Sequence, residues 1–74
     1  MSPTDLTPRQ LDVLRGLAAG LTFRQIGERY GISPVTASNY AIAIYRRLDV
    51  STAHGAVGEG YRRGILRVEE EPGG

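Results

Sequence analysis

The hydrophobic residues of this chain recur at the spacing of α-helices, and no segment shows the sustained alternation of a β-strand. One apolar face follows Pro8 and consists of Val13, Leu14, Leu17 and Ala18. A second, with residues spaced four, three and four apart, consists of Ala37, Ala41, Ile44 and Leu48. Because residues at this spacing share one side of a helix, the pattern predicts an all-α fold around one core.

Start and stop signals divide this pattern into four predicted helices. Two Thr-x-x-Gln capping boxes, at 7–10 and 22–25, open the first and second helices. Ser33 followed by Pro34 opens the third helix, and Ser51 is the predicted cap of the fourth. Glycines stop the first, second and fourth helices. We therefore expect helices over about 8–19, 23–30, 34–48 and 52–63.

The length and the charge distribution suit one small domain. The chain has 74 residues and no cysteine, so neither a disulfide nor a thiolate-bound metal supplements the core. All nine basic residues are arginine, and three of the eight acids form the run Glu69–Glu71. Outside that run the basic residues outnumber the acids, which permits a polyanionic partner, although a GC-rich genome explains the arginine usage equally well. We expect a domain over 6–67, a flexible N-terminus over 1–5 and a disordered acidic tail over 68–74.

Features that the sequence lacks exclude several classes of function. The N-terminus has neither the basic nor the apolar region of a signal peptide, and no apolar run reaches membrane-spanning length, which predicts a cytoplasmic protein without membrane contact. His54 is the single histidine, so we expect no metal site and no other cofactor. No nucleophile accompanies this histidine and no glycine-rich phosphate loop follows a strand, so we expect neither enzymatic activity nor a small-molecule ligand.

The connection between the second and third predicted helices carries the functional signal. Only Gly31, Ile32 and Ser33 join them. A turn this short forces a steep crossing, which is the geometry of a helix-turn-helix unit. In such a unit the first helix crosses the DNA backbone while the second enters the major groove.

Several motifs around this turn, in register and without gaps, resemble the LuxR/GerE family of bacterial transcription regulators. They are Leu6-Thr7-Pro8-Arg9, Val13-Leu14, Ala18-Ala19-Gly20-Leu21-Thr22, the run from Ile26 to Pro34, Thr36, Asn39, the run from Arg46 to Ser51, Ala56-Val57 and Arg63-Gly64. The similarity covers about residues 6–66 and is to the stand-alone, GerE-like domain. It implies a four-helix fold in which the third helix reads DNA and the fourth usually forms a dimer contact.

Helical periodicity indicates which residues would face DNA. If the stripe from Ala37 to Leu48 is buried, the base-reading residues on the outward side of the third helix are Val35, Ser38, Asn39 and Ile42. Asn39 is suited to hydrogen-bond adenine, and the apolar side chains of Val35 and Ile42 to contact a thymine methyl group. Phosphate contacts are expected from cationic or hydroxyl-bearing residues on or beside the second and third helices, namely Thr22, Arg24, Arg29, Thr36, Tyr40, Arg46 and Arg47.

The sequence departs from its relatives on this outward side and leaves two functions open. Relatives usually carry basic residues around the positions of Val35, Ser38 and Ile42, and a histidine where Tyr40 stands. The first function is a transcriptional regulator that inserts the third helix into double-stranded DNA and contacts RNA polymerase. The alternative is a protein-interaction module on the same fold. It would bind RNA polymerase or another regulator through Val35, Ile42 and Tyr40, with weak or no DNA binding of its own.

The fourth predicted helix contains three glycines, at positions 55, 58 and 60, each costing roughly 1 kcal/mol relative to alanine. One explanation is the close approach of two such helices across a homodimer axis, with Val57, Gly58 and Tyr61 at the interface. The other is a short or frayed helix that only tertiary contacts stabilise. A twofold-symmetric dimer would bind a palindromic or paired site with half-sites about one helical turn apart.

Overall fold

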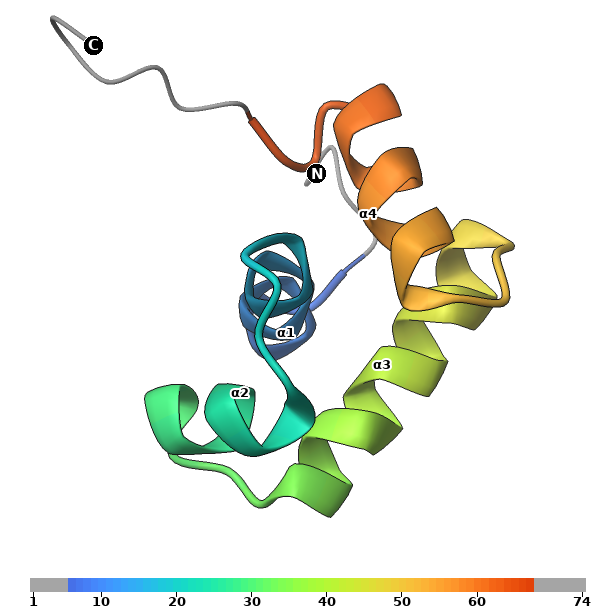
Figure 1. The fold of residues 1–74 in the computed structure, drawn as a ribbon. Coiled ribbons are helices and arrows are strands. Elements are labelled where there is room, and N and C mark those ends of the chain that lie inside the picture. The colour runs from blue at the N-terminus through green and yellow to red at the C-terminus, as the bar shows by residue number, and fades with distance from the viewer. Residues whose placement is uncertain (1–5, 68–74) are drawn as a thin grey trace, which may run out of the picture.

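Four α-helices account for most of residues 6–67, the part of the chain that the computed structural model describes (Figure 1). They are α1 (Pro8–Ala18), α2 (Phe23–Tyr30), α3 (Pro34–Leu48) and α4 (Ala53–Arg62). The prediction of an all-α, four-helix fold is confirmed. The expected flexible N-terminus over 1–5 and disordered acidic tail over 68–74 lie outside the described residues.

Both predicted capping boxes are present. The hydroxyl oxygen of Thr7 accepts from the backbone N–H of Gln10 at 3.2 Å, and the Gln10 side chain accepts from the Thr7 N–H at 3.0 Å. The Thr22 and Gln25 pair makes the same two bonds at 3.1 and 2.9 Å. Each box satisfies two backbone donors that the start of a helix would otherwise leave unpaired, so α1 and α2 begin where the sequence indicates.

The start of α4 differs from the prediction by one residue. The cap is Thr52 rather than Ser51, since the Thr52 hydroxyl accepts from the N–H of Gly55 at 2.9 Å. The reason lies in the preceding turn, where Asp49 takes a left-handed conformation (φ 58°) and Val50 packs against the core. These two residues complete the end of α3, so the chain extends through Ser51 before the next helix begins.

The end of α4 returns the chain to the core. Gly64 has a φ of 77°, its N–H donates to the Tyr61 carbonyl at 3.1 Å, and the N–H of Ile65 donates to the Gly60 carbonyl at 2.8 Å. These two bonds form a Schellman motif, which requires a left-handed residue and favours glycine there. The motif directs Leu66 inward, where only 7% of its surface is exposed, so this segment folds back onto the core.

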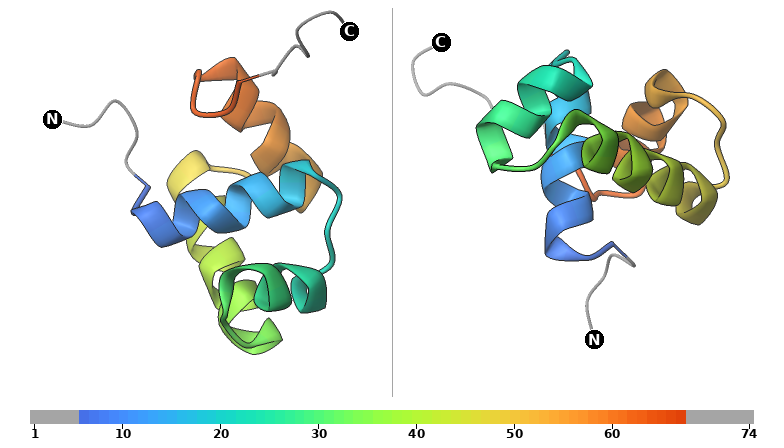
Figure 2. Two further views of the ribbon diagram at one scale, coloured as in Figure 1. Left: turned by 90° about the vertical axis from the view of Figure 1, so that its left-hand side faces the viewer. Right: turned by 90° about the horizontal axis from the view of Figure 1, so that it is seen from below.

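Helices α1 and α3 form the centre of the molecule, with α2 at one end and α4 at the other (Figures 1 and 2). Helices α1 and α3 contact each other, and each of them also contacts α2 and α4. Helices α2 and α4 do not contact one another. The predicted stripe of α3 is fully buried. The whole core consists of Leu6, Val13, Leu14, Ile26, Ala37, Ala41, Ile44, Leu48, Ala56 and Leu66. Burial of this apolar surface is the main stabilising term of the domain.

No helix within residues 6–67 is long and apolar enough to cross a membrane.

Candidate nucleic-acid interface

The turn between α2 and α3 is held by backbone contacts. Gly31 has a φ of 73°, and the N–H of Ile32 donates to the carbonyl of Gly27 at 3.0 Å. A Cβ atom on Gly27 would overlap the carbonyl oxygen of Ile32. The backbone of the turn therefore lies directly against α2, and Ile32 packs against the core as its apolar character predicts. This close approach produces the steep crossing of a helix-turn-helix.

A contact that sequence reasoning missed attaches α2 to α1. Arg9, in the first turn of α1, donates from Nη1 to the carbonyl oxygen of Tyr30 at 3.0 Å. Tyr30 is the last residue of α2, where carbonyl groups lack helical partners and attract cations. Since the two residues are 21 positions apart, no local pattern indicates the bond. It supports the orientation of α2 on α1.

The start of α3 is capped by Ser33. Its hydroxyl oxygen accepts from the N–H of Thr36 at 3.0 Å and donates to the Thr36 hydroxyl at 2.9 Å. The Thr36 hydroxyl thus uses a lone pair locally and keeps its own proton as a donor. A hydroxyl donor at the positive end of a helix is well placed for an anionic oxygen.

The outward side of α3 carries a continuous stripe, Val35, Asn39, Ile42 and Arg46, which we call the reading stripe. All four side chains are exposed, Val35 by 70% and Ile42 by 45%. The spacing of four, three and four residues matches that of the buried stripe on the opposite side of the helix. Three of the four residues predicted for base readout therefore share one line, whereas Ser38 is half-buried beside it.

One flank of the reading stripe adjoins the start of α1. A shallow hollow there is lined by Gln10 of α1 and by Thr36, Asn39, Tyr40 and Ala43 of α3. Tyr40 is half-buried and packs against the core with part of its surface. Two of the residues predicted for phosphate contact, Thr36 and Tyr40, thus lie next to Asn39 on the same side of the helix.

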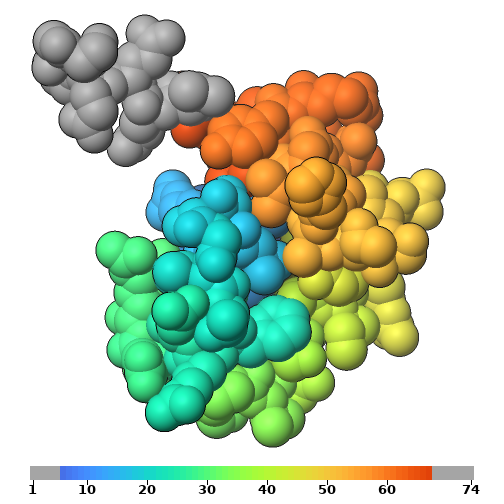
Figure 3. Space-filling view, viewed as in Figure 1, coloured from blue at the N-terminus to red at the C-terminus, as the bar shows by residue number. Residues whose placement is uncertain are grey.

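Four arginines lie on the two helices of the helix-turn-helix, two on α2 and two near the end of α3, and α2 and the start of α3 form the lower end of the molecule in Figure 3. Those on these two helices are all exposed: Arg24, Arg29, Arg46 and Arg47. The nearest acid to Arg24 is Glu28, at 3.8 Å between Nε and Oε2. The other three form no ion pair with any residue of 6–67. Their charges are therefore available to a polyanion.

The two arginines at the end of α4 are instead paired with an acid. Glu59 accepts from Nε of Arg62 at 3.1 Å and from Nε of Arg63 at 2.8 Å. The Arg62 and Arg63 hydrogen bonds lower the pKa of the Glu59 carboxyl to about 2. Arg63 also donates to the carbonyl of Leu48 at the end of α3, at 3.4 Å. This cluster ties α4 to α3 and offers less free positive charge than the helix-turn-helix.

The three glycines of α4 have different surroundings. A Cβ on Gly60 would lie 2.8 Å from Cδ1 of Leu66 and 3.3 Å from Cδ2 of Leu14, and one on Gly55 would lie 3.3 Å from Cβ of Val50. Contacts inside one chain therefore account for these two glycines. Gly58 differs, because a Cβ there would meet nothing within 4 Å.

The other two residues predicted for a dimer contact, Val57 and Tyr61, also differ in their exposure. Tyr61 is 41% exposed, whereas Val57 is half-buried and packs partly on the core of its own chain. The outward surface of α4 is thus formed by Gly58 and Tyr61 more than by Val57.

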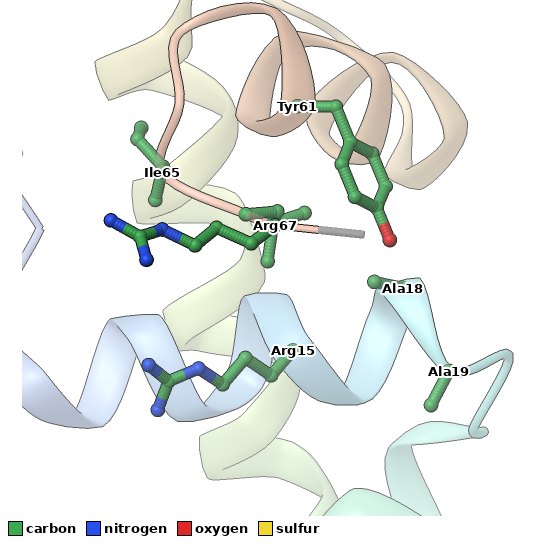
Figure 4. A pocket seen from close by; sticks show the side chains of 7 residues that line it. Arg15, Ala18, Ala19, Tyr61, Ile65 and Arg67 are labelled. Carbon is green, nitrogen blue, oxygen red and sulfur yellow. The ribbon is translucent and has the colours of Figure 1, made fainter. Parts of the chain in front are cut away.

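A second hollow lies between α1 and the end of α4 (Figure 4). Its lining combines small and apolar side chains with two arginines: Arg15, Ala18, Ala19, Tyr61, Ile65, Leu66 and Arg67. Residues of α2 and α3 take no part in this lining, so a ligand on the reading stripe would leave the hollow open. Within residues 6–67 no three or more histidine or acidic side chains come together in a group suited to hold a metal ion.

Comparison with known proteins identifies the family. A search of curated proteins and a search of solved structures each gave no significant match. The family model GerE, described as bacterial regulatory proteins of the luxR family, matches residues 4–58, which include all of α1, α2 and α3. This is well over half of the chain, and it agrees with the capped helices and the tight turn. The chain therefore belongs to the luxR family of bacterial regulatory proteins and forms the DNA-binding helix-turn-helix domain of that family.

Proposed function

We propose that this domain is a sequence-specific transcriptional regulator that inserts α3 into the major groove of double-stranded DNA. The observation that carries this proposal is the exposed reading stripe of Val35, Asn39, Ile42 and Arg46, on a helix-turn-helix whose Arg29, Arg46 and Arg47 form no ion pair within residues 6–67. An α-helix with its side chains is about 10–12 Å wide, and the major groove is about 12 Å wide. The stripe therefore meets base edges while its flanks meet the two phosphate backbones.

Asn39 has the central role in base recognition. Its amide group offers a donor and an acceptor side by side, which complement N7 and the amino group of adenine. Asn39 lies between Val35 and Ile42 on the exposed line, so its amide would lie at the middle of the docked surface. Ser38, at the edge of the stripe, supplies a hydroxyl that can pair with several bases.

Phosphate contacts come from both sides of the stripe. On α2 they involve Arg24 and Arg29 with the Thr22 cap at its start, and on α3 they involve Thr36, Tyr40, Arg46 and Arg47. Such contacts set the register on the duplex without reading its sequence. Each phosphate that an arginine neutralises adds to the salt dependence of binding.

The regulator acts as a homodimer through α4. Gly58 is open to a neighbouring backbone and Tyr61 offers an exposed aromatic ring, and Val57 borders them. A twofold axis through this surface would present two copies of α3 to a palindromic or paired site with half-sites about one helical turn apart. The hollow between α1 and the end of α4 shares Tyr61 with this surface, and the rest of its lining would be left for a partner protein such as RNA polymerase.

Selection of binders from a randomised duplex pool, at two salt concentrations, tests the DNA proposal. We expect one enriched motif, a salt-dependent affinity, and loss of the motif with Asn39→Ala while the salt dependence remains. The alternative is a protein-interaction module on the same fold, favoured by the exposure of Val35 and Ile42 beside Tyr40. An absence of both a motif and any salt-dependent shift would favour that module and reject the regulator.

Sedimentation equilibrium tests the dimer. Tyr61 also lines the hollow beside α1, so Tyr61→Glu alone does not isolate the dimer surface. Gly58→Glu is the cleaner variant, because a side chain there meets nothing within its own chain. We expect both variants to shift the chain toward monomer. A wild-type chain that stays monomeric at all accessible concentrations, with and without a paired DNA site, would reject the dimer.

A further inference from the structure

We propose that the reading stripe recognises a half-site of A·T base pairs and does so through the C5-methyl groups of thymine. The proposal rests on the proposed docking of α3 in the major groove and concerns the chemistry read there. Its basis is the unusual combination of two well-exposed apolar side chains with one amide on the outward side of α3.

The apolar residues of the stripe are the two most exposed large hydrophobic residues within residues 6–67. Within residues 6–67 three large hydrophobic side chains are exposed, and two of them, Val35 and Ile42, flank Asn39 on this stripe. Contact with an apolar surface removes such groups from water, which is favourable. In the major groove the only apolar group that a base presents is the methyl group of thymine. Thymine is therefore the base that complements Val35 and Ile42.

The first nine residues of α3 lack the charged side chains that read G·C pairs. From Pro34 to Ile42 there is no arginine or lysine to reach guanine O6 and N7, and no carboxylate to accept from the cytosine amino group. The nearest cation on the stripe is Arg46, a full turn beyond Ile42 and close to the end of the helix. Asn39, the one bidentate group between the apolar residues, matches adenine. All three positions thus favour A·T pairs.

The spacing of the stripe gives the length of the half-site. At about 1.5 Å per residue, Val35 and Ile42 lie about 10 Å apart along the axis of α3, with Asn39 between them. Base pairs stack at about 3.4 Å along each strand. The part of the stripe from Val35 to Ile42 therefore covers about four base pairs. We infer a core in which one adenine, read by Asn39, lies between two thymine methyl positions.

Replacement of thymine by deoxyuridine tests the proposal, because it removes the C5-methyl group and keeps the base-pairing edge. The probes are duplexes carrying the motif selected from a randomised pool, with single thymines replaced one at a time. We expect an A·T core, and a loss of affinity of about three- to tenfold at two thymine positions. Val35→Ala should abolish the sensitivity at one of these positions and Ile42→Ala at the other.

A double-mutant cycle separates methyl contact from the recognition of DNA shape, which also favours A·T-rich sequences. Coupling between Val35→Ala and one uridine position supports direct contact, whereas additive effects at every position would overturn the proposal. Arg47→Gln is the matched control, since it should weaken binding equally on thymine and uridine duplexes. Enrichment of a G·C core, or equal affinity for uridine duplexes, would also overturn the methyl proposal and leave the DNA-binding function intact. Loss of all DNA binding would reject both.

Discussion

Cδ1 of Leu66 lies 2.8 Å from the position that a Cβ atom on Gly60 would occupy. The Schellman motif at Gly64 brings Leu66 back over α4, and the missing side chain at position 60 makes the space for it. Gly60 is therefore a packing residue of the monomer, although a sequence with three glycines in one helix also suggests a contact between helices. A large side chain at position 66 therefore requires a small residue at position 60.

This pair predicts a coupled effect of two substitutions. Gly60→Leu should destabilise the domain by about 1–3 kcal/mol through overpacking, and Leu66→Ala by about 2–4 kcal/mol through the cavity it leaves. The double variant should be more stable than the sum of the two losses implies, by at least about 0.5 kcal/mol. Urea denaturation of the four proteins measures this coupling, and strict additivity would contradict the packing described.

Gly58 is predicted to behave in the opposite way. Its Cβ would meet nothing within 4 Å, and Gly58 itself is exposed in the interior of α4. Gly58→Ala should raise the free energy of unfolding by up to about 1 kcal/mol, since alanine loses less backbone entropy in a helix than glycine does. The measurement belongs at a protein concentration where the chain is monomeric. A destabilised monomer would show that position 58 is more constrained than its open surroundings indicate.

The cap of α4 provides a third test with a matched control on the neighbouring residue. Thr52→Ala removes the side-chain acceptor for the Gly55 N–H and should cost about 1 kcal/mol. Ser51→Ala changes an exposed hydroxyl that forms no bond with residues of the described chain, and should leave the midpoint of unfolding nearly unchanged. If the two costs were reversed, the helix would begin one residue earlier than the structure has it.

Glu59 makes the stability of the domain depend on pH in the acid range. The pKa of its carboxyl is about 2 in the folded chain, below the ordinary value of 4.5, because Arg62 and Arg63 hydrogen-bond the charged form. The stabilisation is present in full above about pH 4.5 and is lost as the pH falls toward 2. Glu59→Gln should therefore flatten the fall of the melting temperature over this range. Glu28→Gln is the control. The carboxylate of Glu28 lies 3.8 Å from Arg24 on an exposed surface, so its replacement should change the profile less.

Replacing an arginine that flanks the reading stripe should change the salt dependence of DNA binding. Arg47→Gln should weaken binding by a similar factor on all sequences and should lower the slope of log affinity against log salt by about one unit. Arg62→Gln is the control, because Arg62 lies on α4 and pairs with Glu59. Fluorescence anisotropy over a range of salt concentrations measures both slopes. Equal slopes for Arg47→Gln and the wild type would show that Arg47 does not contact a phosphate.

The ends of most helices could be predicted from the sequence because their signals are local. The Thr7 and Gln10 box closes through bonds between residues three apart, and the stripe from Ala37 to Leu48 depends only on the period of a helix. The same period placed Val35, Asn39 and Ile42 on one exposed line. The predicted cap of α4, Ser51, is wrong. Asp49 and Val50 decide where the turn between α3 and α4 ends, and a local capping signal does not contain them.

The sequence by itself thus determined the four helices, the tight turn and the outward side of α3. Only the tertiary structure decided how these parts are held. The bond from Arg9 to Tyr30 joins residues 21 apart, and the one from Arg63 to Leu48 joins residues 15 apart. The role of Gly60 likewise depends on where Leu66 returns. These contacts form only when the helices pack. Packing brings the arginines to the unpaired carbonyl groups at the ends of other helices, and it brings the Leu66 side chain onto Gly60.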